Sequence, residues 1–481
     1  MAFFTILRII AVILGIVGST LIIPLIVAIC YGETQVILPV VIPMVCSWIF
    51  AIVMLIAGRG KKTKLSTKSS FVIVALSWIA ASLFGAIPLY FSGAIPSITD
   101  AVFESVSGFT TTGATILSTV ENLPVSMNLW RCLTHWLGGM GIVALTVALL
   151  PLLGVGGFQL IKAETTGPEK GKFTAKITST AKTLWLIYFA LTFIEFILLL
   201  IAGDNFVDAM SVAFATLGSG GFSTKNGGIG DYNSLPIEII ITVFMFLAGI
   251  NFTMFYNIIT GRFKDLKENT EFKTYLGICG IAVLLITFFE CSTYGGFFKS
   301  LRYSSFQVGA IISTTGFGTA DYTYWKPASQ VIIFLMFFIG GCSGSTGGGV
   351  KVIRWICLWK QLKIEIKKML HPHGVFTMRI DNKEINKTLP VTVAAFFAIW
   401  CIMIVITTFI ACIFGVEIFT SFTGALSMVG NVGPAFGALG PSANYGWLHP
   451  VVKWWYSFAM IAGRLELFTM IIFFTPDYWK K

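Results

Sequence analysis

Charged residues are scarce in this 481-residue chain: they make up 11% of it, whereas a typical soluble domain has roughly 25%. Hydrophobic residues make up 56%, more than a water-soluble fold of this length would carry, so a soluble globular protein is excluded. Most of the apolar runs approach the ~20 residues that cross a bilayer as a helix, and they predict about ten crossings, the first retained rather than cleaved as a signal peptide. The runs lie near 3–30, 38–58, 70–92, 129–153, 183–202, 235–260, 274–291, 327–341, 389–414 and 450–474.

Residues suited to metal binding or catalysis are also few. The four histidines include one close pair, His371 and His373, and the nine cysteines include no CxxC pair. Neither set has the spacing of a metal site. No paired carboxylates and no His-rich motif lie within the apolar runs, which argues against an intramembrane enzyme. We therefore expect neither enzymatic activity nor an organic cofactor.

Positive charge is abundant but unevenly placed. The formal net charge is +11, and most lysines and arginines fall in the connections 59–68, 162–182, 262–273 and 351–387 or at the C-terminus. The positive-inside rule assigns these alternate connections, and with them both termini, to the cytoplasm. This distribution argues against nucleic acid as a partner. The longest polar connection, 360–387, leaves two interpretations open: anchoring to anionic membrane lipid, or docking of a soluble regulatory subunit.

Four short segments of the chain resemble one another. They align without a gap and cover residues 100–115, 208–223, 303–318 and 420–435. The alignment places four glycines in one column: Gly113, Gly221, Gly316 and Gly433. Each segment is too short to cross a bilayer and lies between two long apolar runs, so the pattern predicts a helix, a re-entrant half-helix, a loop and a second helix, four times over.

Local chemistry supports the half-helices. Asp100 and Asp208 suit the starts of the first two, where a carboxylate complements the free amide groups and the positive end of the helix dipole. Irregular backbone at membrane depth is tolerated only where it is buried or lines a water-filled path. Four such loops around one axis would line a pore; the alternative is four ordinary re-entrant turns in a packed transporter core.

The loop residues favour a cation pathway. Glycine allows positive φ at no steric cost, so successive carbonyls can point inward and replace the hydration shell of an alkali cation. The expected ion-binding residues are Thr111, Thr112 and Gly113; Gly220, Gly221 and Phe222; Thr314, Thr315 and Gly316; and Asn431, Val432 and Gly433.

A glycine-rich stretch, GGCSGSTGGG at 340–349, interrupts the last run of the third repeat and precedes Lys351. A phosphate-binding loop would need the lysine beside a glycine and followed by Ser or Thr, but Val350 and Val352 flank it. Glycine costs about 1 kcal/mol per residue inside a helix, so the helix must break here. The break is either a mobile plug across the pore or a static kink. The expected gate residues are Gly340, Gly341, Ser343, Gly344, Ser345, Thr346, Gly347, Gly348 and Gly349.

Arg464 lies deep in the final apolar run, in the stretch MIAGRLELF. A guanidinium stays protonated in any protein environment, so at that depth it must contact water or a partner. A structural ion pair is one interpretation. The other is a fixed positive charge near the pore that helps to hold the glycine-rich loop. Arg131 and Lys453 lie nearer the outer ends of their helices, where they could extend toward water, and no role is expected for them.

The four quasi-repeats, the loops GFTTTGAT, LGSGGFST, STTGFGTAD and GNVGPAFG, and the interrupted helix at GGCSGSTGGG resemble the Trk/Ktr/HKT superfamily of potassium transporters. Within it, the chain is most similar to the membrane subunits of bacterial Trk systems. The resemblance covers nearly the whole chain. It implies an all-α membrane protein, a homodimer, a cytosolic ring of nucleotide-binding TrkA subunits that controls opening, and an arginine of the last helix acting at the gate. Gly113, where sodium-selective members tend to have serine, favours potassium.

From this resemblance we expect a two-helix hairpin over 1–66 and four M1-P-M2 repeats, meaning helix, half-helix and helix, over 67–165, 166–268, 269–375 and 376–481. The expected function is potassium uptake across the bacterial cytoplasmic membrane through a gated pore, driven by the membrane potential. A proton- or sodium-coupled symporter with alternating access is the alternative, which paired broken helices would support. Only one M2 helix is obviously broken in the sequence, and the repeats share one orientation.

Overall fold

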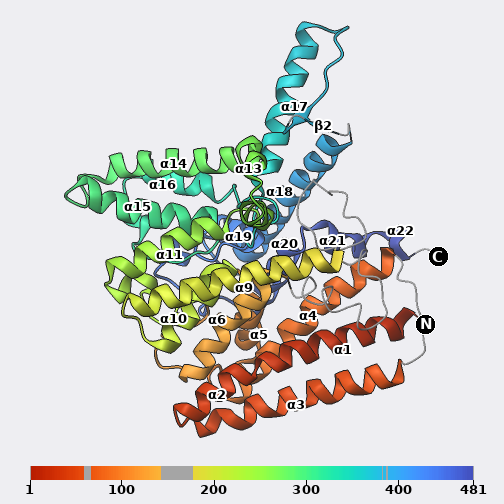
Figure 1. Cartoon of the computed structure of the whole chain (residues 1–481), viewed down its shortest axis with the longest axis vertical. Helices are drawn as coiled ribbons and strands as arrows, with labels where there is room; N and C mark the ends of the chain where they lie inside the picture. Colours follow the sequence, from red (N-terminus) through yellow and green to blue (C-terminus); the bar gives the residue numbers. More distant parts are fainter. Residues whose placement is uncertain (1, 59–66, 142–176, 382, 386–387, 480–481) are drawn as a thin grey trace.

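The computed structural model describes residues 2–58, 67–141, 177–381, 383–385 and 388–479. In this part of the chain the fold is almost entirely helical, which confirms the predicted fold class (Figure 1). The end of the expected run 129–153, most of the basic segments 59–68 and 162–182, and the expected repeat boundary at 165/166 lie outside the described residues.

The N-terminal hairpin consists of α1 (Ala2–Thr20), α2 (Ile22–Cys30) and α3 (Thr34–Ala57). Helix α1 packs along α3 and along α4 (Thr67–Phe91). At the tip of the hairpin the Glu33 carboxylate accepts hydrogen bonds from the amides of Val125 (2.6 Å) and Ser126 (3.2 Å). The hairpin is therefore fastened to the start of a helix that belongs to the first repeat.

The first helix of each repeat is long and unbroken. These M1 helices are α4 (Thr67–Phe91), α9 (Ile177–Ile201), α14 (Thr270–Glu290) and α18 (Leu389–Ile413). Together with the two stretches of the hairpin they are the six described helices long and apolar enough to cross a membrane. The number rises to eight if each of two bent helix pairs counts as one span.

The predicted half-helices are confirmed. They are α5 (Ile98–Phe109), α10 (Phe206–Gly218), α15 (Phe297–Ile312) and α19 (Ile418–Gly430). Three of them begin with a side-chain cap, from Ser97, Asn205 and Glu417, that accepts backbone amides of the first turn. Asp100 and Asp208 both lie in the first turn, as expected.

The second helix of each repeat, M2, is short. In order these helices are α6 (Val125–Gly139), α11 (Leu235–Ala248), α16 (Pro327–Met336) and α20 (Pro450–Arg464). Helix α11 turns by 96° into α12 (Phe252–Ile259), and α20 turns by 114° into the segment Phe468–Phe474, which contains α21 (Phe468–Ile471) and the 3-10 turn η5 (Ile472–Phe474). The expectation that only the third M2 helix is interrupted is therefore wrong.

The third repeat continues after its break as α17 (Val352–Leu370), which rises away from the helical body (Figure 1). Two two-residue strands follow it, β1 (Arg379–Ile380) and β2 (Lys383–Glu384), paired antiparallel. The remaining short elements are η2 (Gly228–Tyr232), α13 (Phe263–Glu268), η3 (Tyr322–Tyr324), η4 (Gly437–Leu439) and α22 (Pro476–Trp479).

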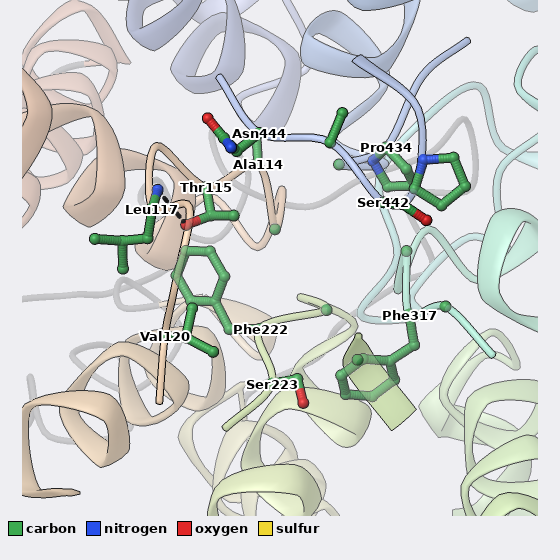
Figure 2. A pocket seen from close by; sticks show the side chains of 18 of the residues that line it. Ala114, Thr115, Leu117, Val120, Phe222, Ser223, Phe317, Pro434, Ser442 and Asn444 are labelled. Atoms are coloured by element: carbon green, nitrogen blue, oxygen red, sulfur yellow. Dashed lines mark hydrogen bonds between the residues drawn. The ribbon is translucent and has the colours of Figure 1, made fainter. Parts of the chain in front are cut away.

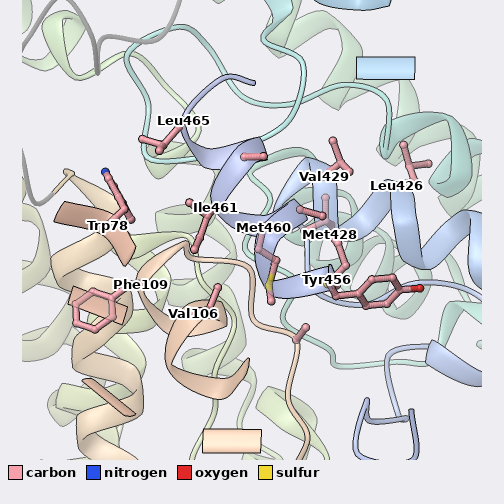
Figure 3. Close-up of a cluster of buried hydrophobic side chains, with 14 of the residues drawn as sticks. Trp78, Val106, Phe109, Leu426, Met428, Val429, Tyr456, Met460, Ile461 and Leu465 are labelled. Atoms are coloured by element: carbon pink, nitrogen blue, oxygen red, sulfur yellow. The ribbon is translucent and has the colours of Figure 1, made fainter. Parts of the chain in front are cut away.

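The core joins the last repeat to the first. Side chains of α4 and α5, among them Trp78, Val106 and Phe109, lie on one side of α20, and residues of α19 such as Met428 lie on the other (Figure 3). All four are buried. This packing closes the repeats into a ring rather than a row. The starts of α1 and α4 and the last helix α22 lie at one end of the helical body (Figure 1).

Candidate functional site

Each half-helix ends in the same local conformation. The residue after the helix, or one residue later, has a left-handed backbone, with φ of 54° at Thr111, 56° at Ser219, 57° at Thr314 and 53° at Asn431. In the first, second and fourth loops the next amide donates back across the last helical turn, as Thr112 does to the Ser107 carbonyl (2.9 Å). This is the Schellman arrangement that closes a helix C-terminus. The left-handed residue recurs in all four loops although their sequences differ.

The aligned glycines follow directly. Their φ values are 78°, 81°, 75° and 101° for Gly113, Gly221, Gly316 and Gly433. A side chain is strongly disfavoured in that region, so the sequence alignment is confirmed as a structural repeat. Left-handed backbone is also costly for the β-branched Thr111 and Thr314, by about 1–3 kcal/mol each. Backbone strain of this kind concentrates at functional sites.

The four loops close into a ring. A Cβ atom added to Gly113 would lie under 3.0 Å from the carbonyl oxygen of Gly220 in the next loop. The same relation links each later glycine to a carbonyl of the following loop: Gly221 to Thr315, Gly316 to Val432, and Gly433 back to Thr112. Each glycine is thus packed against a carbonyl of its neighbour. The four carbonyl oxygens that precede the glycines therefore belong to one closed cycle of contacts between the loops.

Side chains behind the ring brace it. The hydroxyls of Thr110 and Thr112 share a hydrogen bond (2.9 Å), as do those of Ser313 and Thr315 (2.6 Å). The Asn431 amide donates to Thr112 Oγ1 (3.0 Å) and so links the fourth loop to the first. All five residues are buried.

On one side of the ring lies a cavity of about 120 Å³ lined by residues of all four repeats. Figure 2 shows Ala114 and Thr115 of the first repeat, Phe222 of the second, Phe317 of the third and Pro434 of the fourth around it. Of the predicted ion-binding residues, five line this cavity, namely Gly113, Gly221, Phe222, Gly316 and Gly433. The other seven belong to the same four loops, and all of them are buried.

The glycine-rich segment lies on the opposite side of the ring. No helix is present between Met336 and Val352, which confirms the predicted break. The two ends of the loop meet, because the Gly340 amide donates to the Val350 carbonyl (2.8 Å). At its tip the Gly348 amide donates to Thr314 Oγ1 (2.6 Å) and the Thr346 hydroxyl lies 2.7 Å from that of Ser219.

Bare backbone is required where this loop meets the half-helix ends. A Cβ on Gly347 would lie 2.6 Å from the Ser313 carbonyl oxygen, and one on Gly348 would lie 2.5 Å from that of Gly430. The loop also reaches the break in the second M2 helix, since the Cys342 amide donates to the Gly249 carbonyl (2.8 Å). Glycines in this stretch therefore interrupt the helix and also allow the loop to pack directly against the ring.

Two positively charged side chains bind the loop. The Arg464 guanidinium donates to the Thr346 carbonyl (2.7 Å) and to the carbonyls of Gly138 (2.7 Å) and Gly139 (2.9 Å) at the end of α6. The Lys351 ammonium donates to the Gly347 carbonyl. Arg464 was expected near the gate loop, and the structure brings the two together. The contact of Lys351 was missed because its only sequence signal is its position directly after the glycines.

A carboxylate binds backbone amides near both ends of the same loop. Glu271 in α14 is buried, and its Oε1 accepts the amides of Ser343 (2.7 Å) and Ile353 (3.1 Å). The remaining predicted gate residues take turn or contact positions: Gly344 (φ 75°), Gly349 (φ 66°), Gly341, whose carbonyl accepts the Val352 amide, and Ser345, whose hydroxyl lies 3.4 Å from the Lys351 ammonium.

Known proteins share this architecture. A model of the TrkH family, described as cation transport protein, matches residues 38–289 and 299–481. The chain belongs to the TrkH family. It is 37% identical to the Trk system potassium uptake protein TrkH of Escherichia coli K12, with 88% of each chain covered, and 33% identical to the protein TrkG of the same organism, with 87% of each covered. The crystal structure of the potassium transporter TrkH from Vibrio parahaemolyticus is similar over 100% of both chains, with a TM-score of 0.88 and 31% identity.

Two basic residues of this TrkH-family chain were assigned incorrectly from the sequence. Arg131 and Lys453 were expected to extend toward water, but both side chains are buried. Arg131 pairs with Glu104 (2.6 Å) and Lys453 with Asp100 (2.6 Å), both on the half-helix α5. The available signal was the spacing of the two carboxylates, four residues apart on a helix, which places them on one face.

Proposed function

We propose that this protein carries potassium into the cell across the cytoplasmic membrane, through one pore whose selectivity filter is the ring of four loops. The observation that supports the filter most directly is the cyclic contact between each aligned glycine and a carbonyl of the next loop. Carbonyl dipoles around one centre replace the hydration shell of an alkali cation and repel anions. The relatives are named potassium uptake proteins, which favours potassium as the cargo.

The twelve predicted loop residues then have two roles. Four carbonyls, those of Thr112, Gly220, Thr315 and Val432, are the proposed ligands, and the neighbouring residues set their spacing. The fourth loop contributes differently, because the Gly433 carbonyl accepts a hydrogen bond from the Tyr445 hydroxyl (2.7 Å). Transport through this ring needs no catalytic group, and we assign the chain no enzymatic activity.

The loop 340–349 is the proposed gate. Its contacts with Ser219 and Thr314 support this role, because a loop that lies against the half-helix ends on the inner side of the ring would obstruct the path. A gate needs two arrangements of similar energy, and a regulator acts by binding them unequally. The arrangement described above is the obstructing one, held by Arg464, Lys351 and Glu271.

Regulation is proposed to act through α17 and the segment that follows it. This part extends from the helical body and carries exposed apolar side chains such as Trp359, Met369 and Val375 beside its lysines. Exposed apolar residues on a projecting helix favour a protein partner over lipid headgroups alone. A cytosolic TrkA-type ring of nucleotide-binding subunits fits this position, with the chain itself as a homodimer and both termini in the cytoplasm.

A coupled symporter with alternating access is the second candidate. The sharp bends after α11 and α20 favour it, since broken helices at mid-membrane are common in such transporters. The pore is favoured because all four repeats have the same orientation and surround a single ring. We divide the chain accordingly into a hairpin over 1–66 and repeats over 67–165, 166–268, 269–375 and 376–481.

Planar-bilayer recording of the purified protein distinguishes the two candidates. A pore gives unitary currents above ~10⁶ ions per second, whereas a conformational cycle of microseconds to milliseconds per ion cannot. Potassium flux without resolvable unitary currents, together with a fixed stoichiometry to a proton or sodium gradient, would establish the symporter. Absence of potassium transport both in bilayer recordings and in a flux assay on proteoliposomes, from protein that remains folded, would refute the proposed function.

A further inference from the structure

A buried ion pair lies directly behind the first loop of the ring. Glu104 in α5 is 1% exposed and Arg131 in α6 is 2% exposed. The guanidinium donates through Nε (2.8 Å) and Nη2 (2.6 Å) to the same carboxylate oxygen, Oε1. Its third nitrogen donates to Asn128 Oδ1 (2.7 Å). A pair so completely removed from water persists only where the surrounding contacts are well satisfied.

The carboxylate also holds the chain that leaves the first loop. Glu104 Oε1 accepts the Thr115 hydroxyl (2.9 Å), and Oε2 accepts the Ile116 amide (2.9 Å). Thr115 and Ile116 follow Gly113 by two and three residues. The position of the first loop above its half-helix is therefore fixed by one carboxylate from inside that half-helix.

The same pair reaches two other loops. The Arg131 guanidinium lies 4.2 Å from the ring centre of Phe222, which follows the aligned glycine of the second loop. The Thr115 carbonyl accepts the amide of Tyr445, whose hydroxyl donates to the Gly433 carbonyl in the fourth loop. Three of the four loops thus share this one network, and their mutual spacing depends on it.

Charge gives a second reason for the pairing. Arg131 lines the cavity above the ring, together with Lys225, and among the described residues that line this cavity none is a carboxylate. An uncompensated guanidinium here would repel entering cations in a low-dielectric site. Glu104 neutralises it from behind, so the arginine can brace the loops without opposing the cargo.

We propose that Arg131 and Glu104 are a positioning pair that sets the cation specificity of this ring. The proposal rests on the proposed function, since it assumes that the ring selects the ion. A guanidinium that bonds through two nitrogens and stacks on a ring face cannot be replaced by an ammonium. Loss of its geometry loosens the spacing of three loops and admits the smaller sodium ion.

The chain contains a matched control pair. Arg302 in α15 donates through two nitrogens to Glu238 in α11 (2.6 and 2.5 Å), and it likewise joins a half-helix to an M2 helix. The Glu238 side chain is 3% exposed and that of Arg302 is 29% exposed, and neither residue lines the cavity. Substitutions at this partly buried pair report what the loss of an ion pair between a half-helix and an M2 helix does to folding alone.

The test compares R131K and E104Q with R302K and E238Q in proteoliposomes, measuring the potassium-to-sodium permeability ratio and the unfolding temperature. We expect the ratio to fall roughly tenfold for R131K and E104Q and to stay within about twofold of the parent for the control pair. Thr115→Val, which removes one hydroxyl from the network, should lower the ratio by about threefold and serves where the charge variants do not fold.

The proposal would be overturned if variants of both ion pairs changed the potassium-to-sodium permeability ratio equally. An unchanged permeability ratio in a folded Thr115→Val protein would also overturn it. Gly113→Ser and Gly316→Ser separate this outcome from a failure of the filter itself. If the glycine variants lower the permeability ratio while R131K does not, the ring selects the ion and the Arg131–Glu104 pair only stabilises the fold. If neither set changes the ratio, the ring is not the filter.

Discussion

The two long helices of each repeat differ sharply. The M1 helices run unbroken for 24, 21, 21 and 25 residues in their membrane-spanning parts, and three of the four are buried over only 28–33% of their most apolar window. The M2 helices stop after 15, 14, 10 and 15 residues. M1 helices satisfy their backbone internally, and the last three leave apolar flanks uncovered by protein, as helices in contact with lipid do. The M2 helices leave backbone groups that other parts of the protein must satisfy.

Side chains and amides near the ends of other M2 helices satisfy several of those groups. The carbonyls that end α6 accept from Arg464 at the end of α20, and the Gly249 carbonyl after α11 accepts from Cys342 in the third repeat. Glu466, beyond α20, pairs with Arg354 at the start of α17 (2.5 Å). The four M2 ends are therefore one bonded layer beneath the ring. Movement of the third-repeat loop would disturb contacts with the other three repeats, so the proposed gate depends on all four.

Small residues on M2 seat the half-helices. A Cβ on Gly138 of α6 would lie under 3.0 Å from the Phe109 carbonyl oxygen, and one on Gly463 of α20 would do the same to that of Val429. Both carbonyls belong to the last turns of half-helices in the same repeats. In contrast, Gly277 and Gly280 on the M1 helix α14 face open space. Glycine is thus a packing requirement on M2 and carries no such requirement at these M1 positions.

The largest effect is expected at the ring. Gly113→Ala adds a methyl group against the Gly220 carbonyl and at a positive φ, so the first and second loops must separate. We expect potassium uptake to fall by about a hundredfold or more, since a displacement of ~1 Å at a functional site can cost that factor. Gly277→Ala is the matched control. Uptake that stays near the parent value in Gly113→Ala would show that the ring is not the path.

Removal of the loop should act in the opposite direction. Deletion of Ser343 to Gly347 shortens the segment that contacts Ser219 and Thr314, and basal potassium flux should rise roughly tenfold in protein purified without a partner. The permeability ratio should survive, because Gly316 is held by its own half-helix. A folded deletion protein whose flux stays at or below that of the parent would leave the loop a static kink.

A single side chain should reproduce part of that rise. Arg464→Ala removes three hydrogen bonds that tie the loop to α6 and α20, and bonds to charged donors contribute about 1.5–3 kcal/mol each at most. We expect basal flux to increase about threefold to tenfold. Arg8→Ala is the control, since Arg8 also donates to a helix-end carbonyl, that of Gly58, but in the N-terminal hairpin. Equal effects of both variants would exclude a specific latch.

Local signals in the sequence predicted the half-helices, the aligned glycines and the break at 340–349, because helix caps, positive φ and glycine-rich stretches act within a few residues. The bends after α11 and α20 were missed because apolar residues continue past Gly249 and Leu465, and hydropathy does not register a turn. Partners such as Glu104 for Arg131 lie 27 residues apart. The four-residue spacing of Asp100 and Glu104 places both carboxylates on one face of α5, but only the fold brings their basic partners to that face.

The smallest expected effect tests the contrast between the two helix types by stability alone. Gly463→Ala on α20 places a methyl group against the Val429 carbonyl, a backbone atom that cannot rotate away. Overpacking of this kind costs about 1–3 kcal/mol, so the unfolding temperature in detergent should fall by several degrees. Gly280→Ala on α14 meets open space and gains helix propensity, so its unfolding temperature should stay level or rise slightly. Equal shifts in the two variants would mean that the M2 glycine has no packing role, and the difference between M1 and M2 would then rest on the helix breaks alone.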